Sequence, residues 1–428
     1  MTIIFTIIIL IFLFTFLTIF ISKGMSKNPP AVFMLFLIVF LFITEASFRN
    51  RELDDSSIDF QVILRLSVWF VITLYSLVCY RKIFNLLLDS NVKYLTFYCF
   101  FCLITTIYSP IPIYTGVNSL IQFSFLIFAA ALAVNLNLKQ ICLAIFYMSI
   151  FFHVISLILV PILPELAVME YWGQGEIGGQ RITGLSGSAN AYGQMAGLAI
   201  VITQYLKNKM VIRQPVYFLT MFLFIICIIV SWSRTSIFIT IIGLSLIEKE
   251  LVKKYFSYGV TMLFFIVISY FSVFNIDDLL LKFSRNGSIE EILTFTGRTD
   301  IWLAVWNEAI LSPIWGYGYA STKLLLPQIF ETDWGWSTVT AHSMFFQLFF
   351  TTGMVGVILF YTALYIFYKL CRILNNVLLN YVFFLILING LLESGVAGPV
   401  PNKLTFLFFL FFLVSIRMYY ESKCKDGN

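Results

Sequence analysis

Long apolar runs, separated by short polar segments, recur along the chain of 428 residues. A helix needs about 20 apolar residues to cross the hydrocarbon core of a bilayer, and the runs approach that length. Runs this long exclude a strand-based barrel, in which apolar and polar positions alternate. We predict about thirteen membrane-spanning helices, over residues 3–21, 30–44, 60–80, 92–108, 117–134, 141–160, 188–205, 214–231, 235–248, 256–274, 342–368, 377–392 and 404–420.

The pattern predicts an all-α fold, a polytopic transmembrane helical bundle of about 12–14 spans. Residues 1–274 would form a bundle of ten predicted spans. The polar segment 275–341 is too long to be a tight connection, and we predict a loop that carries an amphipathic helix. Residues 342–428 would hold the last three spans and a polar tail.

Composition agrees with this class of protein. Hydrophobic residues make up 60% of the chain and charged residues only 11%, whereas soluble domains carry roughly 25% charge. The net charge of +5 is accounted for by loops on one side of the membrane. It therefore gives no reason to expect a nucleic-acid partner.

Lysine and arginine set the predicted orientation. Fourteen of them follow odd-numbered spans and five follow even-numbered spans, the long loop left aside. Positive loops stay in the cytoplasm, so we expect the N-terminus outside, the C-terminus in the cytoplasm and the loop 275–341 facing outward. The acidic residues of 45–59 also fall on the outer side, where a solvated loop accounts for them.

The seven cysteines give no sign of a disulfide framework, because none lies in the long loop. Cys99 and Cys102 have C-x-x-C spacing, but they lie in an apolar run, where packing is expected rather than metal or redox chemistry. Neither an Asp-rich cluster nor a nucleotide fingerprint stands out. We expect no metal ion and no cofactor.

The long loop contains a helix start at Arg298, within Gly297-Arg298-Thr299-Asp300. A stripe at i, i+3, i+4 and i+7 spacing follows it, formed by Trp302, Val305, Trp306 and Ala309. We predict an amphipathic helix on the membrane surface, with tryptophan at headgroup level; substrate stacking by Trp302 is the alternative. Arg298 would join the helix dipole in attracting an anion.

Arg234 and His342 adjoin apolar runs on the outer side. The run 216–230 would reach about 22 Å as a helix, short of a ~30 Å hydrocarbon core, so the turn with Arg234 is expected below the membrane surface. Arginine at that depth normally faces a polar cavity; the alternative is a side chain that extends to the headgroups. His342 suits a general base or hydrogen-bond partner, whereas His153, inside a span, is predicted to be structural.

Three other polar residues are candidates for substrate binding. Arg181 and Asn190 bound a segment rich in glycine and serine, which permit close backbone approach and hydrogen bonding. This segment could bind a phosphate or sugar, or form a re-entrant turn, and the sequence leaves both open. Glu393 could pair with an arginine of the site or act on an acceptor hydroxyl, although we favour a plain loop carboxylate.

Outward-facing arginines beside a histidine suit a pyrophosphate attached to a lipid, because guanidinium groups bind phosphate oxygens bidentately and remain charged. Five short motifs follow one another over roughly 180–360: Gly184-Leu185-Ser186-Gly187-Ser188-Ala189-Asn190, Ser233-Arg234-Thr235, Gly297-Arg298-Thr299-Asp300-Ile301-Trp302, Pro313-Ile314-Trp315-Gly316-Tyr317-Gly318, and Ala341-His342-Ser343 with Gly353-Met354-Val355-Gly356. In their order and spacing the chain resembles the bacterial O-antigen polymerase/O-antigen ligase family of membrane glycosyltransferases.

The resemblance implies a multi-pass protein of the bacterial inner membrane. Its active site would face the periplasm and would use glycans carried on undecaprenyl pyrophosphate. Arg234, Arg298 and His342 match the family's two arginines and its histidine, which bind the pyrophosphate or assist the acceptor hydroxyl. The family's histidine is commonly followed by asparagine, whereas Ser343 follows here. An extra N-terminal helix would account for thirteen spans rather than twelve.

We therefore expect an O-antigen or capsular repeat-unit polymerase that works by metal-independent glycosyl transfer. His342, Arg298 and Arg234 would be catalytic, and Arg181, Asn190, Glu393 and Trp302 would bind substrate. The partners would be the lipid-linked donor and acceptor, the bilayer and a chain-length regulator that contacts the periplasmic loop. The alternatives are an O-antigen ligase, which transfers the glycan to lipid A–core, and a polysaccharide flippase or transporter, for which the chain lacks two-half symmetry.

Overall fold

The computed structural model describes residues 28–48, 59–169, 180–250, 253–254, 297–331 and 337–426. The predicted spans 3–21 and 256–274, and the start of the long loop at 275–296, lie outside these residues. The described helices and strands are α2 (Pro29–Glu45), α3 (Phe60–Ser76), η1 (Leu77–Cys79), α4 (Tyr80–Leu87), α5 (Lys93–Ile104), η2 (Thr105–Ile107), α6 (Pro112–Asn135), α7 (Leu138–Ile162), α8 (Pro164–Ala167), β1 (Val168–Met169), β2 (Arg181–Ile182), η3 (Gly184–Ser186), α9 (Ala189–Asn208), α10 (Gln214–Val230), α11 (Arg234–Ile247), α15 (Arg298–Ala309), α16 (Thr322–Ile329), α17 (Met344–Leu374), α18 (Val377–Leu392), η4 (Gly395–Ala397) and α19 (Lys403–Asp426).

The predicted all-α membrane architecture is confirmed. Each of the other predicted spans coincides with a described helix. Among the described residues, five helical segments are long and apolar enough to cross a membrane: Phe60–Leu87, Pro112–Asn135, Leu138–Ile162, Met344–Leu374 and Lys403–Cys424. Shorter apolar helices such as α10 and α11 stand beside them, so the chain is a multi-pass helical membrane protein.

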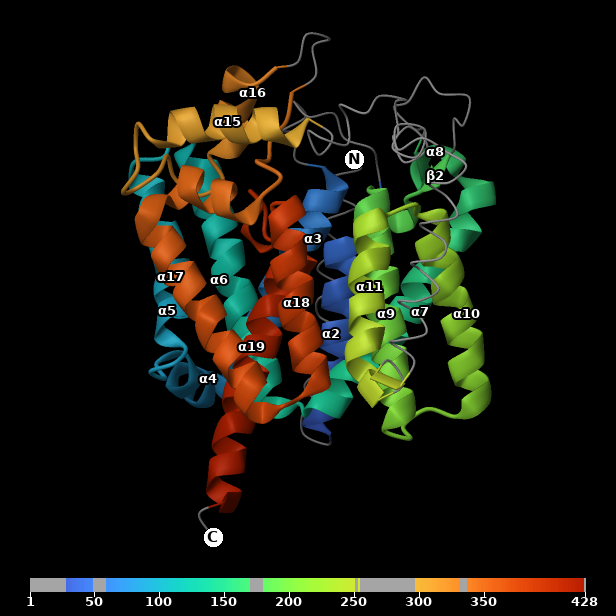
Figure 1. Ribbon diagram of the computed structural model, residues 1–428. Helices are drawn as coiled ribbons and strands as arrows, with labels where there is room; N and C mark the ends of the chain where they lie inside the picture. The colour runs from blue at the N-terminus through green and yellow to red at the C-terminus, as the bar shows by residue number, and fades with distance from the viewer. Residues whose placement is uncertain are drawn as a thin grey trace, which may run out of the picture.

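The long helices run side by side between the two ends of the bundle (Figure 1). One end carries α8, β2, α15 and α16, and the other carries α4 and the C-terminus. Helix α9 packs against α7, α10 and α11, while α19 packs against α6, α17 and α18. The β-structure is a two-stranded antiparallel ribbon in which Val168 pairs with Ile182 and Met169 with Arg181.

Helix α19 forms the centre of the second group. Its sequence is apolar on all sides from Phe406 to Val414, which is typical of a helix surrounded by protein. Every side chain from Phe406 to Val414 is buried. Phe406 stacks on Phe128, and other phenylalanines of α2, α6 and α17 pack around the helix. The high phenylalanine content of this part of the chain therefore contributes to the packed core.

Helix starts follow local capping chemistry. The Asp59 carboxylate accepts a hydrogen bond from Val62 N at the start of α3, and Asn376 caps α18 in the same way. Asn137 and Gln140 form a capping box at the start of α7. These residues satisfy backbone N–H groups that a helix end would otherwise leave unpaired.

Helix α17 is broken at Gly353, whose φ of 58° and ψ of −165° belong to a region that only glycine occupies readily. The loop 313–318 fills the break. Backbone hydrogen bonds join the two segments, from Tyr317 N to Phe350 O, from Gly318 N to Thr351 O and from Met354 N to Pro313 O. The loop supplies the partners that the broken helix lacks and so fixes its own position beside α17.

Replacing Gly353 with alanine is expected to destabilise the protein strongly. A Cβ there would lie 2.3 Å from Ile314 O and 2.6 Å from Trp315 N, and the backbone conformation alone costs a non-glycine residue about 1–3 kcal/mol. Thermal unfolding in detergent measures the effect. Gly297→Ala is the control, because Gly297 also has a positive φ of 78° but no described atom would lie within 4 Å of its Cβ. Equal losses in the two variants would contradict the packing argument.

Candidate functional site

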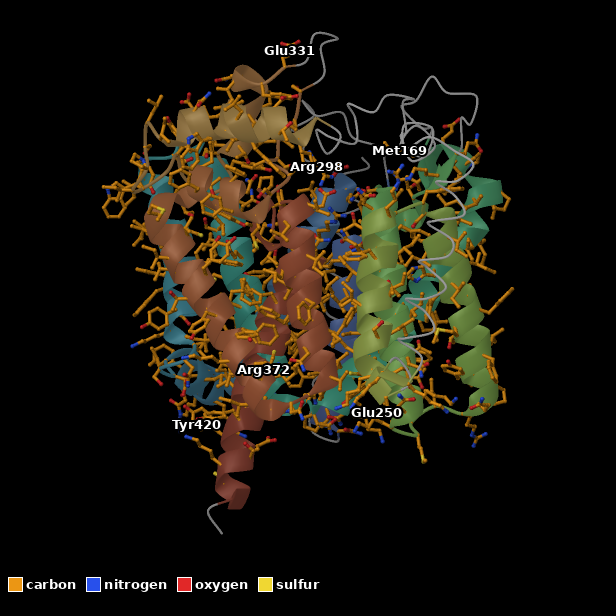
Figure 2. The ribbon with its side chains drawn as sticks, in the orientation of Figure 1. Met169, Glu250, Arg298, Glu331, Arg372 and Tyr420 are labelled. Atoms are coloured by element: carbon orange, nitrogen blue, oxygen red, sulfur yellow. The ribbon has the colours of Figure 1, made fainter. Side chains whose placement is uncertain are left out.

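The predicted site residues come from segments far apart in sequence that meet at one end of the bundle. Arg298 begins α15, His342 precedes α17, and Glu393 follows α18. Figure 2 shows Arg298 at this end and Arg372 at the opposite end. The helical fold therefore places the start or end of several helices around one region.

Glu393 is the residue that joins the others. Its Oε1 accepts a hydrogen bond from Arg298 Nη2 at 2.8 Å, and its Oε2 lies 3.1 Å from His342 Nδ1. Asn190 Nδ2 donates to the same Oε1 at 3.3 Å. The side chains of Arg298, His342 and Glu393 remain 20–25% exposed. The prediction of a plain loop carboxylate is wrong, because two basic side chains and an amide converge on it.

The contacts of Glu393 change its acidity. Burial raises the pKa of this carboxyl, but the hydrogen bond from His342 and the positive charge of Arg298 outweigh burial. The pKa of Glu393 therefore lies below its ordinary value, and the group is a carboxylate at neutral pH.

This carboxylate orients the imidazole of His342. A carboxylate only accepts hydrogen bonds, so the proton of the neutral ring is assigned to Nδ1. Nε2 then carries the lone pair, and Thr338 Oγ1 lies 3.3 Å from it. The backbone of His342 has a φ of 47°, which is unusual for a residue with a side chain. A ring held in this way can accept a proton at Nε2 while Glu393 stabilises the resulting positive charge.

Arg181 lies on the other side of Asn190. Its Nη2 donates to Asn190 Oδ1 at 3.0 Å, and its Nε donates to Ser231 O at 2.9 Å. Asn190 thus links Arg181 to Glu393, so the amide bridges the two arginine-bearing parts of the site. The two residues that bound the glycine- and serine-rich segment are therefore in direct contact.

Arg234 takes a different position from the other basic residues. It is the first residue of α11, follows Ser233 and is exposed. Ser231, whose carbonyl binds Arg181, lies in the same turn. The structure places Arg234 near the Arg181 end of the network, and no contact with Glu393 is observed for it within the described residues.

Trp302 has a role that the spacing alone did not reveal. Its Nε1 donates to Ala341 O at 3.0 Å, and its ring stacks on Phe346. Val305 and Ala309 of the same stripe are fully buried, and α15 packs on α17. Most of the predicted membrane-facing stripe therefore packs against α17, while Trp306 remains 43% exposed. The i, i+3, i+4 and i+7 spacing suits any apolar surface beside a helix.

Sequence reasoning missed four polar residues of this region. Thr338 and Gln347 lie within five positions of His342, and that closeness is the only signal the sequence offers for them. Glu45 is not part of a solvated acidic loop. It is buried and accepts a hydrogen bond from Lys403 Nζ at 2.6 Å. Because Glu45 and Lys403 are 358 positions apart, no sequence pattern predicts that they pair.

Other sequence-based predictions can be compared with the structure. All seven cysteines are free, and His153 is buried in α7 with its Nδ1 2.7 Å from Ser149 O, as expected for a structural histidine. Within the described ranges, no group of three or more His, Cys, Asp or Glu side chains could hold a metal ion.

Acidification is expected to weaken the fold through Glu393. Because its pKa is lowered in the folded protein, the carboxylate contributes stability above the unfolded-state pKa of about 4.3. That contribution is lost as the pH falls through the lower folded-state pKa. Glu393→Gln should therefore melt at a lower temperature than the native chain at pH 7, and the difference should shrink as the pH falls below about 4. A melting-temperature difference that does not change with pH would contradict the proposed coupling between Glu393 ionisation and stability.

Comparison with known proteins finds a family similarity over part of the chain. Residues 182–361 match a family of proteins described as O-antigen ligase. No curated protein matches the chain. The matched segment contains Asn190, Arg234, Arg298 and His342, while Arg181 directly precedes it and Glu393 lies beyond its end. Over these residues the chain is similar to the O-antigen ligase family, in agreement with the resemblance that its motifs suggest.

Proposed function

We propose that the protein is a repeat-unit polymerase, which joins glycans carried on undecaprenyl pyrophosphate by metal-independent transfer. The observation that carries the proposal is the convergence of Arg298 and His342 on Glu393. This arrangement offers a base and a cationic group within one polar region of a membrane protein. Both are required when a hydroxyl displaces a pyrophosphate.

The proposed reaction is a single displacement. A hydroxyl of the acceptor sugar attacks the anomeric carbon of the donor glycan, forming the new glycosidic C–O bond. The bond between that carbon and the pyrophosphate oxygen breaks, and undecaprenyl pyrophosphate leaves with the electron pair. The hydroxyl proton passes to Nε2 of His342, and Glu393 stabilises the imidazolium. One displacement inverts the anomeric centre.

The arginines would stabilise the leaving group. A guanidinium has five N–H donors, and the observed contact with Glu393 engages Nη2 of Arg298. Charge that develops on the pyrophosphate would be offset by Arg298 and by the exposed Arg234, with Arg181 at the Asn190 side. Binding both lipid-linked glycans at one end of the bundle would also hold the acceptor hydroxyl next to the anomeric carbon, which lowers the entropic part of the barrier.

The proposed orientation puts the site in the periplasm and the C-terminus in the cytoplasm of a bacterial inner membrane. The distribution of basic residues supports it. Arg372, in the last turn of α17, lies at the end of the bundle opposite the site (Figure 2). Lys207 and Lys209 lie at the C-terminal end of α9, whose N-terminal end carries Asn190. Basic residues concentrate on the cytoplasmic side of membrane proteins.

An O-antigen ligase is the second candidate. It is favoured by one specific observation, the description of the matching family as O-antigen ligase. The ligase would use the same donor chemistry and differ in its acceptor, which would be a sugar of lipid A–core. The polar network described above suits either acceptor.

Deletion of the gene separates these functions. If the protein is a polymerase, lipopolysaccharide from the deletion strain should run on a gel as core bearing a single repeat, with the ladder gone. If it is a ligase, bare core should appear while polymer accumulates on undecaprenyl pyrophosphate. An unchanged ladder would exclude both functions in lipopolysaccharide synthesis.

A further inference from the structure

Gln347 is a buried amide that bonds three separate segments of the chain. It lies in the first turn of α17 and is fully buried. Its Oε1 accepts hydrogen bonds from Ala341 N at 2.9 Å and from Ser394 Oγ at 3.4 Å. Its Nε2 donates to Thr322 Oγ1 at 2.8 Å, at the start of α16. The amide orientation follows from its partners, because Ala341 N can only donate.

Two of these segments carry the residues on which the proposed chemistry depends. Ala341 directly precedes His342, and Ser394 directly follows Glu393. One carbonyl oxygen therefore touches the chain next to both members of the His342–Glu393 pair. The pair itself comes from residues 51 positions apart, so its spacing has to be set by tertiary contacts.

The backbone at His342 requires such support. Its φ of 47° lies in the left-handed region, where a residue with a side chain is held only by its surroundings. The preceding residue, Ala341, is fixed at both of its backbone polar groups. Gln347 accepts from Ala341 N, and Trp302 Nε1 donates to Ala341 O at 3.0 Å. Few conformations satisfy both bonds, so the direction of the His342 side chain is restricted.

We propose that Gln347 is a positioning residue, which sets the distance between His342 and Glu393 and so the orientation of the base. The proposal rests on the proposed function of His342 in glycosyl transfer. A glutamine suits this position because it offers an acceptor and a donor in one rigid plane. An apolar residue of equal volume would leave Ala341 N and Thr322 Oγ1 without these partners.

The test compares Gln347→Met with Glu393→Gln and with the double variant. Each full-length protein is reconstituted in proteoliposomes with lipid-linked repeat units extracted from a strain that lacks the gene, and glycan elongation is followed. Gln347→Met keeps the side-chain volume and is expected to lower kcat about tenfold or more while KM changes less than threefold. Thr203→Val is the matched control, because Thr203 is also buried and its hydroxyl donates within its own helix, to Ala199 O of α9. It should leave kcat unchanged.

The double variant separates positioning from general stability. If Gln347 acts through the His342–Glu393 pair, its loss should change kcat little once Glu393 is already glutamine. Independent losses that multiply in the double variant would overturn the proposal, and so would a native kcat in Gln347→Met.

Two further variants keep the outcomes distinguishable. Should Gln347→Met not accumulate as a folded protein, Ser394→Ala removes only the bond beside Glu393 and should lower kcat severalfold. An unchanged kcat in Ser394→Ala would then contradict the proposal. His342→Ala run in parallel tests the proposed function itself. Full activity in that variant defeats the function assignment, whereas activity lost in His342→Ala but kept in Gln347→Met defeats only the role of Gln347.

Discussion

Replacing His342 with alanine is expected to abolish glycan elongation by the purified protein. The change removes the only side chain that the account uses to accept the hydroxyl proton, and general base catalysis contributes about 10²–10⁴-fold to such reactions. Glu393 would keep its contact with Arg298 at 2.8 Å, so the carboxylate stays paired and the fold should survive. Elongation of lipid-linked glycan, measured at equal amounts of folded protein, should fall at least about 100-fold.

The other described histidine provides the control for this variant. His153 is buried among Phe152, Tyr192 and Phe224 in the helix bundle. His153→Phe removes an imidazole but should keep activity within about threefold, because no proposed step uses it. Normal elongation by His342→Ala, or equal losses in both variants, would remove His342 from the mechanism.

Replacing Arg298 with lysine should have an effect nearly as large. Lysine keeps the positive charge and can still approach Glu393, but it lacks the planar fork that binds two phosphate oxygens at once. When an enzyme loses a hydrogen-bond donor that stabilises the anion formed in the transition state, kcat typically falls about 10²–10³-fold, or roughly 2.7–4 kcal/mol. The measurement is kcat at saturating donor, together with the melting temperature.

An arginine at the opposite end of the bundle serves as the matched control. Arg417 Nη1 donates to Ala133 O and Leu136 O and so caps the end of α6. Arg417→Lys should lower the melting temperature, because the single nitrogen of lysine cannot hold both carbonyls and Glu421 at once, while kcat stays close to the native value. Full activity in Arg298→Lys would mean that charge alone is needed there and that the bidentate argument is wrong.

Much of the fold could be predicted because membrane helices are encoded by long apolar runs. The prediction for 377–392 matches α18 at both ends, and that for 214–231 differs from α10 by one residue. The break in α17 could not be predicted. Gly353 gives no local signal within an apolar run, and the break depends on backbone bonds from the loop 313–318, which is distant in sequence.

The candidate site was predictable in part. Arg298 and His342 stood out because they are charged or titratable residues beside apolar runs, and the Gly297-Arg298 step does begin α15. Glu393 did not stand out, because a lone acid after a span is commonly a loop residue. Its role depends on the closing of the bundle, which brings the end of α18 against the segment before α17. Trp302 was misjudged for a related reason, since an apolar stripe does not specify whether lipid or protein covers it.

Whether the protein polymerises lipid-linked repeat units is tested most directly with purified protein in liposomes. The liposomes contain a repeat unit on undecaprenyl pyrophosphate and no other protein. A repeat-unit polymerase should produce a ladder of longer lipid-linked glycans and release one undecaprenyl pyrophosphate for each bond formed. The His342→Ala variant should produce no ladder and release no undecaprenyl pyrophosphate. Glycan that crosses the bilayer without elongation, or that is transferred only when lipid A–core is supplied, would contradict a polymerase.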